Sequence, residues 1–157
     1  MPTTRSSSRE RFGAQLGQVA RLWRAEIDRR LAPYGLTESR WRILWQLSRA
    51  REPLTQKALA AAVNVQGPTL VRSLDTLESE GLIERRTVPG DRRIKVVELT
   101  VRATPILERI QTVVTGVRAE LFDDIDPDAL DTCLEVLERL AVRLGADEPA
   151  SPPERGA

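Results

Sequence analysis

The sequence predicts a mainly α-helical protein with one small β-hairpin, an α+β fold of the winged helix-turn-helix type. Three observations lead to this prediction. Residues 54–81 have the pattern of a short helix, a tight turn and a second helix. Residues 83–99 have the pattern of two strands joined by a basic loop. Long helices, each with one apolar stripe, precede and follow this central stretch.

Composition limits the class of protein. A chain of 157 residues is the size of one domain and can form a hydrophobic core, and 41% hydrophobic residues is ordinary for a globular protein. The apolar runs are far shorter than the ~20 residues that cross a bilayer, and no apolar signal-peptide core follows Met1. We therefore expect a cytoplasmic protein that does not enter a membrane.

Residue types that support catalysis or metal binding are scarce. Cys133 is the only cysteine, which excludes an intramolecular disulfide and a cysteine-cluster zinc site. The chain has no histidine, which excludes Ser-His and Cys-His catalysis and histidine-ligated metals. It has no glycine-rich phosphate loop and no recognisable pair of catalytic carboxylates. We predict that the protein is not an enzyme and uses neither a metal nor a cofactor.

Charge is unevenly distributed, although the net charge is only +1. Residues 1–39 carry seven Arg and four acidic residues, or +3. Residues 40–102 carry twelve Lys or Arg and seven acidic residues, or +5, and residues 103–157 carry five Arg and twelve acidic residues, or −7. A basic middle beside an acidic C-terminal third is expected if only the middle meets phosphates. Solvated helix faces would explain the same charges, and this alternative stays open.

The N-terminal part predicts two helices. We expect residues 1–8 to form a flexible tail and residues 9–32 to form a long helix that ends before Gly35. Thr37 is expected to cap a second helix that runs to about Ala50. Apolar residues recur in the first helix at intervals of three and four and form one stripe: Phe12, Leu16, Val19, Trp23, Ile27 and Leu31.

The central stretch begins with a short helix and a tight turn. Thr55 is a suitable N-cap, and residues 56–62 are rich in Ala and Leu, which favour helix. Leu59 and Val63 are the expected inward residues. Asn64 follows, and asparagine tolerates the left-handed conformation that a tight turn requires.

The next helix has two different faces. Pro68 suits the first helical position, and Gly67 is an acceptable N-cap before it. Leucines at positions 70, 74 and 77 are spaced to face the core, and Gly81 is expected to end the helix. Polar or basic side chains remain on the outer side: Thr69, Arg72, Ser73 and Thr76.

A hairpin follows this helix. We expect strands at residues 83–88 and 93–99, joined by a Pro-Gly-Asp-Arg-Arg loop with turn chemistry. Arg92 and Arg93 suit the narrow minor groove, where the negative potential is enhanced at A·T-rich tracts. Asp91 is expected to orient an arginine by an ion pair or to cap the loop.

The helix-turn-helix with its polar outer face predicts a reader of the DNA major groove. Arg72 supplies a bidentate donor for the O6 and N7 atoms of guanine. Thr69 and Thr76 offer contacts to phosphate or a thymine methyl, and Gln66 and Pro68 lie where the helix enters the groove. A single basic side chain is unremarkable, but the combination favours DNA recognition. The candidate DNA-binding residues are Gln66, Pro68, Thr69, Arg72, Ser73, Thr76, Asp91, Arg92 and Arg93.

The last third predicts two more helices. Thr100 is expected to cap the first, in which Pro105 permits a kink, and Asp126 to cap the second. We expect the proline-rich residues 145–157 to be disordered. The apolar stripes are Ile106, Ile110, Val113, Val117 and Leu121 in the first helix, and Leu130, Leu134, Leu137, Ala141 and Leu144 in the second.

The apolar stripes of the terminal helices predict a homodimer. Such long helices cannot bury them against one small lobe, and obligate interfaces resemble a protein core cut in half. We assign residues 9–36 and 101–144 to dimerisation and residues 37–100 to DNA binding. A two-fold dimer predicts a pseudo-palindromic operator with half-sites about one helical turn apart. The expected interface residues are Phe12, Leu16, Val19, Leu121, Leu130, Leu134, Leu137 and Leu144.

The same residues carry a resemblance to a known family. GPTLVRSLDTLESEGLIERR at residues 67–86 and PGDRRIKVVELT at residues 89–100 resemble the MarR family of bacterial transcription regulators. The LVRSLDTLE run is similar to the SlyA branch of that family. The resemblance covers about residues 10–144, and Gly67 departs from it because relatives usually carry a polar or capping residue there.

The resemblance implies an obligate homodimer in which the first and last helices of both chains intertwine. It places Arg72 in the major groove, Arg93 in the minor groove and Arg92 on the DNA backbone. Relatives that sense peroxide use a reactive cysteine near the N-terminus. Cys133 instead lies beside the apolar stripe of the last helix, so we expect it to be packed and structural.

Many relatives are released from DNA by small aromatic carboxylates that bind where the dimer helices meet the winged lobe. In this chain most aromatic residues occur early, and an arginine could pair with the carboxylate. Ser73 would couple such a pocket to the DNA-reading helix. The alternative that the tryptophans only form core stays open. The candidate pocket residues are Trp23, Arg24, Tyr34, Arg40, Trp41, Trp45 and Ser73.

Together these patterns predict a homodimeric regulator that binds double-stranded DNA, a repressor released by a small aromatic or phenolic ligand. One alternative is an activator or anti-silencer of the same fold that has no ligand. Another is a winged-helix module that binds a partner protein. The charge asymmetry argues against the second alternative.

Overall fold

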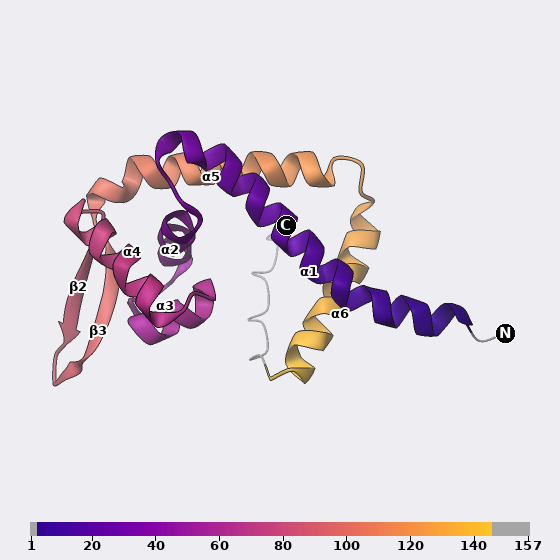
Figure 1. Ribbon diagram of the computed structural model, residues 1–157, viewed down its shortest axis with the longest axis horizontal. Coiled ribbons are helices and arrows are strands. Elements are labelled where there is room, and N and C mark those ends of the chain that lie inside the picture. The colour runs from indigo at the N-terminus through magenta and orange to yellow at the C-terminus, as the bar shows by residue number, and fades with distance from the viewer. Residues whose placement is uncertain (1–2, 146–157) are drawn as a thin grey trace, which may run out of the picture. The chain divides into compact units, whose positions relative to one another are not determined.

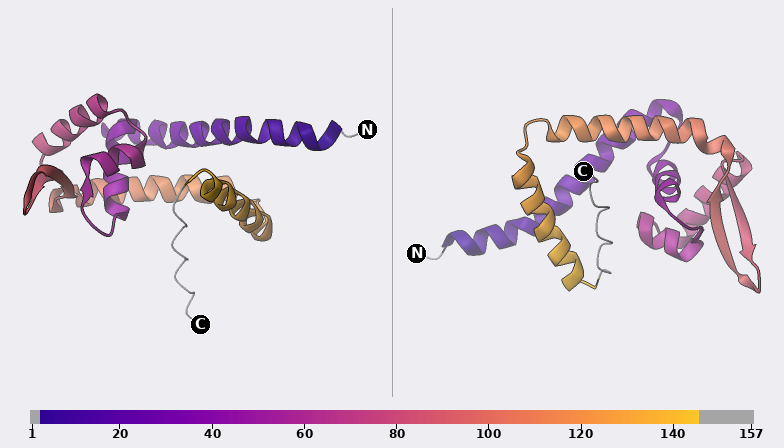
Figure 2. Two further views of the ribbon diagram at one scale, coloured as in Figure 1. Left: turned by 90° about the horizontal axis from the view of Figure 1, so that it is seen from below. Right: turned by 180° about the vertical axis from the view of Figure 1, so that it is seen from behind.

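The computed structural model describes residues 3–145, and the side chains of residues 8–145 except that of Arg92. The chain forms two compact units, residues 1–118 and residues 119–157. In the first unit a long helix leads into a small winged lobe (Figures 1 and 2). The predicted disordered tail falls, from residue 146 onward, outside the described residues.

The predicted fold class is confirmed, because the chain is mainly helical and carries a small antiparallel wing. In chain order the elements are α1 (Thr3–Leu31), the 3₁₀ turn η1 (Ala32–Tyr34), α2 (Glu38–Arg49), β1 (Leu54–Thr55), α3 (Gln56–Val63), α4 (Gly67–Ser79), β2 (Ile83–Val88), β3 (Asp91–Leu99), the 3₁₀ turn η2 (Val101–Ala103), α5 (Thr104–Phe122) and α6 (Pro127–Arg143).

Helix α1 begins at Thr3, six residues before the predicted start at Arg9. The added residues contain neither Gly nor Pro, and Ser and Thr disfavour helix only mildly, so a long helix can extend through them. The end of α1 is buried at Ile27 and Leu31. Gly35 then turns the chain in the left-handed conformation, with φ of 70°.

The wing belongs to a three-stranded antiparallel sheet with the strand order β1–β3–β2. β3 begins at Asp91, two residues earlier than predicted, so only Pro89 and Gly90 separate the two long strands. The short strand β1 was not predicted. It pairs Thr55 with Val96, and a strand of two residues is too short to show an alternating pattern.

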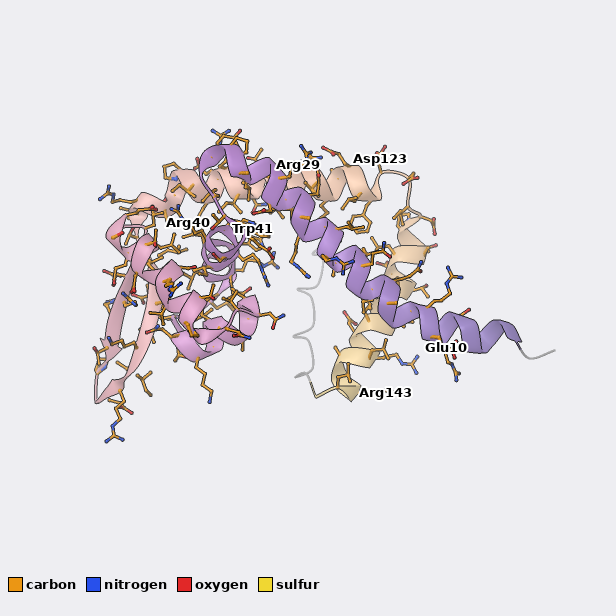
Figure 3. The ribbon with its side chains drawn as sticks, in the orientation of Figure 1. Glu10, Arg29, Arg40, Trp41, Asp123 and Arg143 are labelled. Carbon is orange, nitrogen blue, oxygen red and sulfur yellow. The ribbon has the colours of Figure 1, made fainter. Side chains whose placement is uncertain are left out.

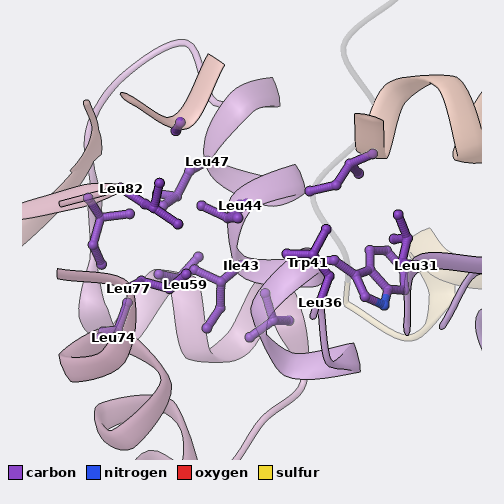
Figure 4. Close-up of a cluster of buried hydrophobic side chains, with 14 of the residues drawn as sticks. Leu31, Leu36, Trp41, Ile43, Leu44, Leu47, Leu59, Leu74, Leu77 and Leu82 are labelled. Carbon is purple, nitrogen blue, oxygen red and sulfur yellow. The ribbon is translucent and has the colours of Figure 1, made fainter. Parts of the chain in front are cut away.

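The core lies in the winged lobe and includes the adjoining parts of α1 and α5. Figure 4 shows the buried side chains that α2, α3 and α4 contribute. Helix α2 is central because four of its twelve residues are buried, namely Trp41, Ile43, Leu44 and Leu47. Among the described residues no polar or charged residue is buried in this core, so apolar packing determines how the helices meet.

Both ends of α4 are defined by local chemistry. The helix begins at Gly67 and its N-cap is Gln66, one residue earlier than predicted, with Pro68 in the first turn. At its other end Gly81 is left-handed, with φ of 72°. The Leu82 N–H donates to the Leu77 carbonyl at 2.9 Å, which is the hydrogen bond of a Schellman motif. The predicted glycine stop is therefore confirmed.

Helix α5 begins later than predicted. Thr100 caps the 3₁₀ turn η2, because its hydroxyl accepts a hydrogen bond from the Arg102 N–H at 3.2 Å. Helix α5 starts at Thr104. Pro105 is therefore its second residue, where a proline removes no intrahelical hydrogen bond and gives no reason for a kink.

The second unit contains α6, and its predicted cap is confirmed. The Asp126 carboxylate accepts a hydrogen bond from the Ala129 N–H at 3.0 Å. No residue of α6 is buried within the described chain. None of the helices described for residues 3–145 is both long enough and apolar enough to cross a membrane.

We predict that Gly81→Ala destabilises the fold by about 1–2 kcal/mol, because a Cβ disfavours the left-handed conformation. The added Cβ would also lie 3.0 Å from Nη1 of Arg102. The measurement is urea unfolding followed by circular dichroism. Gly67→Ala, at the other end of α4, is the matched control because no atom lies within 4 Å of its added Cβ. Equal unfolding midpoints for the two variants would contradict this account.

Candidate nucleic-acid interface

The outer face of α4 is exposed and polar. Gln66 and Pro68 at its start, and Thr69, Arg72 and Thr76 along it, are all exposed. The Thr76 hydroxyl donates to the Arg72 carbonyl at 3.0 Å, which leaves its oxygen free to accept. The opposite face is buried at the three predicted leucines. The leucine spacing therefore presents the Arg72 face to solvent.

Ser73 does not share this outer face, in contrast to the prediction. Its side chain is half-buried, and its hydroxyl donates to the Ser39 hydroxyl of α2 at 3.1 Å. A helix turns by about 100° per residue, so a position next to Arg72 already points toward the neighbouring helix. Ser73 therefore links α4 to α2 and is removed from the surface that faces outward.

The tip of the wing is ordered by Asp91. Its carboxylate accepts a hydrogen bond from the Arg93 N–H at 2.9 Å. Of the two predicted roles, this contact is the loop cap. The Arg93 side chain is exposed beyond this cap. The Arg92 side chain lies outside the described side chains, although its backbone is in β3.

Arg85 joins the wing to α4, and the sequence reading did not identify it. Its Nε donates to Glu78 at 3.0 Å, its backbone N–H donates to Glu78 at 3.1 Å, and its Nη2 donates to Asp75 at 2.7 Å. The hydrogen bond from Arg85 lowers the pKa of Glu78. Two carboxylates three residues apart on α4, followed by an arginine just after the glycine stop, are a signal that could have shown this contact.

Four of the predicted pocket residues meet in one cavity of the first unit. The cavity measures about 360 Å³, and α1 and α2 supply its aromatic wall of Trp23, Trp41 and Trp45. Arg24 lines it as predicted, and Arg42 and Arg118 join it. An aromatic wall beside three guanidinium groups suits a ligand that is both aromatic and anionic.

The Trp41 indole carries a buried polar group next to this cavity. Trp41 is 4% exposed, and its Nε1 has no hydrogen-bond partner among the described atoms. A buried N–H without a partner is costly unless an acceptor reaches it. Two of the cavity's arginines pair with Glu38, whose Oε1 lies 3.9 Å from Nε of Arg24 and 3.3 Å from Nη1 of Arg42.

The other predicted pocket residues lie elsewhere. Tyr34 packs under Arg109 of α5, whose guanidinium carbon is 4.4 Å from the ring centre. Arg40, beside Trp41 in Figure 3, donates to the Gly35 carbonyl at 3.1 Å and pairs with Glu80 after α4. These two side chains hold elements together and do not line the cavity. Ser73 also lies outside it.

The predicted dimerisation residues are largely uncovered in the single chain. Phe12, Leu16 and Val19 on α1 are 37%, 44% and 57% exposed. In the second unit Leu121, Leu134 and Leu144 are exposed, and Leu130 and Leu137 are partly buried. Cys133 is exposed, so the prediction of a packed cysteine is not met within one chain, because α6 buries no residue.

Comparisons with known proteins agree with this geometry. Residues 34–94 match the model of the MarR family. Transcriptional regulator PA3341, whose crystal structure is known, is 44% identical in sequence to this chain. The two structures superpose with a TM-score of 0.80, over 85% of this chain and 97% of that one. The structure of MarR is 29% identical, with a TM-score of 0.67 and coverages of 85% and 96%. A MarR-family regulator from Silicibacter pomeroyi is 24% identical, with a TM-score of 0.75 and coverages of 85% and 90%.

A winged lobe with an exposed, polar recognition helix is the fold of a DNA-binding regulator. The chain belongs to the MarR family of transcriptional regulators. Proteins of this family bind DNA as dimers and are not enzymes. Within the described residues, no group of three or more Cys, Asp or Glu side chains could hold a metal ion.

We predict that Glu78→Gln removes a pH-dependent contribution to stability. Because the pKa of Glu78 is lowered from 4.5, its carboxylate stabilises the fold above that pH, and the contribution is lost as the pH falls through the lowered pKa. Since Glu78 is 38% exposed, we expect less than about 1 kcal/mol at pH 7.

The measurement is urea unfolding of both proteins between pH 7 and pH 3. The difference in free energy of unfolding between wild type and Glu78→Gln should shrink as the pH falls. Glu52→Gln, at an exposed carboxylate between α2 and β1, is the matched control. A constant difference over the whole pH range would contradict the ion pair with Arg85.

Proposed function

We propose that this protein is a sequence-specific regulator that binds a pseudo-palindromic DNA operator as a homodimer. It acts as a repressor that a small aromatic or phenolic ligand releases. The exposed polar face of α4, together with the exposed Arg93 on the wing, is the observation that carries the DNA-binding part. It works in the cytoplasm. The LVRSLDTLE run at residues 70–78 supports a place in the SlyA-like branch.

The two arginines suit different grooves. Arg72 lies in the first half of α4, and its planar guanidinium matches the O6 and N7 atoms of guanine in the major groove. Arg93 lies on a thin hairpin that fits the minor groove. Arg92 contacts the DNA backbone beside it. Other contacts to the operator come from Gln66, Pro68, Thr69 and Thr76.

The homodimer is supported by apolar surface that one chain leaves uncovered. The stripe of Phe12, Leu16 and Val19 runs along a part of α1 in which none of the described side chains is buried. Helix α6 has an apolar stripe and no buried residue. Exposed apolar stripes of this length mark interaction surfaces, and in obligate dimers a second copy of the chain covers such surface. Intertwining of the terminal helices of two chains supplies that cover.

The effector is supported by the cavity between α1, α2 and α5. Its tryptophans stack against an aromatic ring, and Arg24, Arg42 or Arg118 pairs with a carboxylate or phenolate. CouR from Rhodococcus jostii RHA1, which is 21% identical and has a TM-score of 0.72, was solved bound to p-coumaroyl-CoA.

Helix α2 supplies the physical connection between the cavity and DNA. Its residues Trp41 and Trp45 line the cavity. The residues just before them hold α4, since Ser39 bonds to Ser73 and Arg40 pairs with Glu80. A ligand that shifts α2 therefore also shifts the recognition helix. Release requires that the ligand binds the DNA-free arrangement more tightly than the DNA-bound one.

We predict that Arg72→Ala costs about 1–3 kcal/mol of operator binding and relaxes specificity at one base pair, because a bidentate base contact is lost. Arg93→Ala should weaken binding and make the fall of the association constant with salt, on a double-logarithmic plot, less steep by about one. The operator is first selected from random duplexes with wild-type protein, and affinities are then measured by fluorescence anisotropy.

Arg21→Ala, at an exposed arginine on α1 outside the lobe, is the matched control and should bind like wild type. Full operator affinity in both the Arg72 and the Arg93 variant would refute the assignment of the interface. A wild-type affinity that does not depend on salt would favour the alternative of a protein-interaction module.

We predict that the DNA-free protein binds at least one of benzoate, phenylacetate and p-coumarate in calorimetry, and binds it more weakly when operator is present. Arg24→Gln and Arg42→Gln should each weaken ligand binding, because each removes a charge from the cavity wall. Arg109→Gln is the matched control, since this arginine stacks on Tyr34 outside the cavity. Absence of binding for the whole panel would favour a regulator of the same fold without a ligand.

A further inference from the structure

The chain has only two lysines, and both line the same hollow on the winged lobe. Lys57 and Lys95 are the two lysines among 24 basic residues. They come from different elements, since Lys57 is in α3 and Lys95 is in β3. The hollow has a volume of about 440 Å³, and Arg93 adds a third positive charge to its wall.

Strand register explains why these side chains meet. Strand β1 pairs with β3 through Thr55 and Val96, and α3 begins directly after Thr55. The start of α3 therefore lies beside Lys95, which precedes Val96 on the strand. Arg93 and Lys95 both line the hollow from the part of β3 where a register shift interrupts its pairing with β2. The short strand β1 is thus what brings Lys57 to the wing.

Within the part of the chain that the structure describes, no carboxylate pairs with the charges of the hollow. Its wall consists of Thr55, Gln56, Lys57, Arg93, Ile94 and Lys95 and contains no acidic residue. On the neighbouring strand, Arg85 pairs with Asp75 and Glu78, and Arg86 pairs with Glu84 and Glu98. Among the described residues no such ion pair includes Lys57, Arg93 or Lys95. Lys95 contributes only a minor effect to the lowered pKa of Glu78.

The start of α3 adds to the attraction for an anion. The first N–H groups of a helix point outward and carry a partial positive charge. Thr55 takes up one of them, because its hydroxyl accepts a hydrogen bond from the Ala58 N–H at 3.1 Å. The N–H groups that precede Ala58 belong to the same first turn of α3 as Lys57. The hollow thus combines a helix start with three cations from two elements.

We infer that this hollow binds a phosphate of the DNA backbone, with Lys57 and Lys95 as its two point charges. The inference rests on the proposed function, which it extends to a contact that does not read bases. Lysine suits phosphate because its ammonium is a compact charge on a flexible stem, whereas arginine suits bidentate base contacts. Both lysines lie at the backbone site, whereas Arg72 lies on the base-reading face.

The site has a definite role in docking. It lies between the start of α3 and the wing strand β3, so it holds both elements against one DNA strand. A contact of this kind positions the lobe and carries no sequence information. Its loss therefore weakens binding to every duplex by the same factor and leaves the ratio of operator to random DNA unchanged.

The first test measures affinity against salt for Lys57→Gln, Lys95→Gln and the double variant. The logarithm of the association constant falls linearly with the logarithm of the salt concentration. Each substitution should make this slope less steep by about 0.9. Binding to operator and to a random duplex should weaken by the same factor. The double Lys→Arg variant should restore the slope, and Arg21→Gln is the matched control for loss of one positive charge outside the lobe.

The second test uses the fact that an amine-reactive acetylating reagent has only Lys57, Lys95 and the N-terminal amine to modify. Operator should slow acetylation of both lysines, measured by mass spectrometry of peptides, and should leave the N-terminal amine as an internal reference. If wild-type protein binds operator, but operator does not slow acetylation and the Gln variants keep the wild-type salt slope, the phosphate site is overturned. The proposed DNA-binding function would then still stand.

Two further outcomes separate this site from its alternatives. Protection of the lysines by millimolar inorganic phosphate, without protection by DNA, would overturn the backbone contact and indicate a site for a free anion. Failure of the wild-type protein to enrich any sequence from random DNA would overturn the proposed function itself. The phosphate site is supported only when DNA protects both lysines and the slopes fall in the Gln variants.

Discussion

Burial of one face of α4 is the interaction on which the rest of the interface depends. Leu70, Leu74 and Leu77 are 2%, 0% and 0% exposed, and burying each leucine contributes about 1.5–3 kcal/mol. Rotating the helix would expose them, so Arg72 remains on the outer side. The Schellman motif at Gly81 ends the helix, and Arg85 then ties the wing to it through Glu78. Packing and ion pairs together hold the two DNA-reading elements in one geometry.

Helix α2 connects the two proposed functions of the lobe. Its buried residues form much of the core, its tryptophans line the cavity, and Ser39 and Arg40 hold α4. The basic residues show a related division. Arg40, Arg85 and Arg86 are each paired with carboxylates and hold the fold together. The exposed cations of α4, the wing tip and the lysine hollow are left for an external anion.

Much of this fold was predictable because its signals are local. Thr55, Asn64, Gly81 and Asp126 occur where helices start or stop, and each has the predicted conformation or hydrogen bond. The errors have physical reasons as well. The spacing of the leucines does not determine which way Ser73 points, and its hydroxyl bonds to Ser39, which is 34 residues away in the chain. The strand β1 was missed because two residues carry no periodicity.

The sequence by itself determined the fold class, the ends of most helices, and the outward position of Arg72 and Arg93, because caps, turns and apolar spacing act over a few residues. Tertiary structure decided which distant side chains meet. It brought Arg42 and Arg118 to the tryptophan cavity and excluded Tyr34 and Arg40 from it. It also placed Lys57 beside Lys95 through the pairing of β1 with β3. Such contacts join residues far apart in the chain, and local patterns carry no information about them.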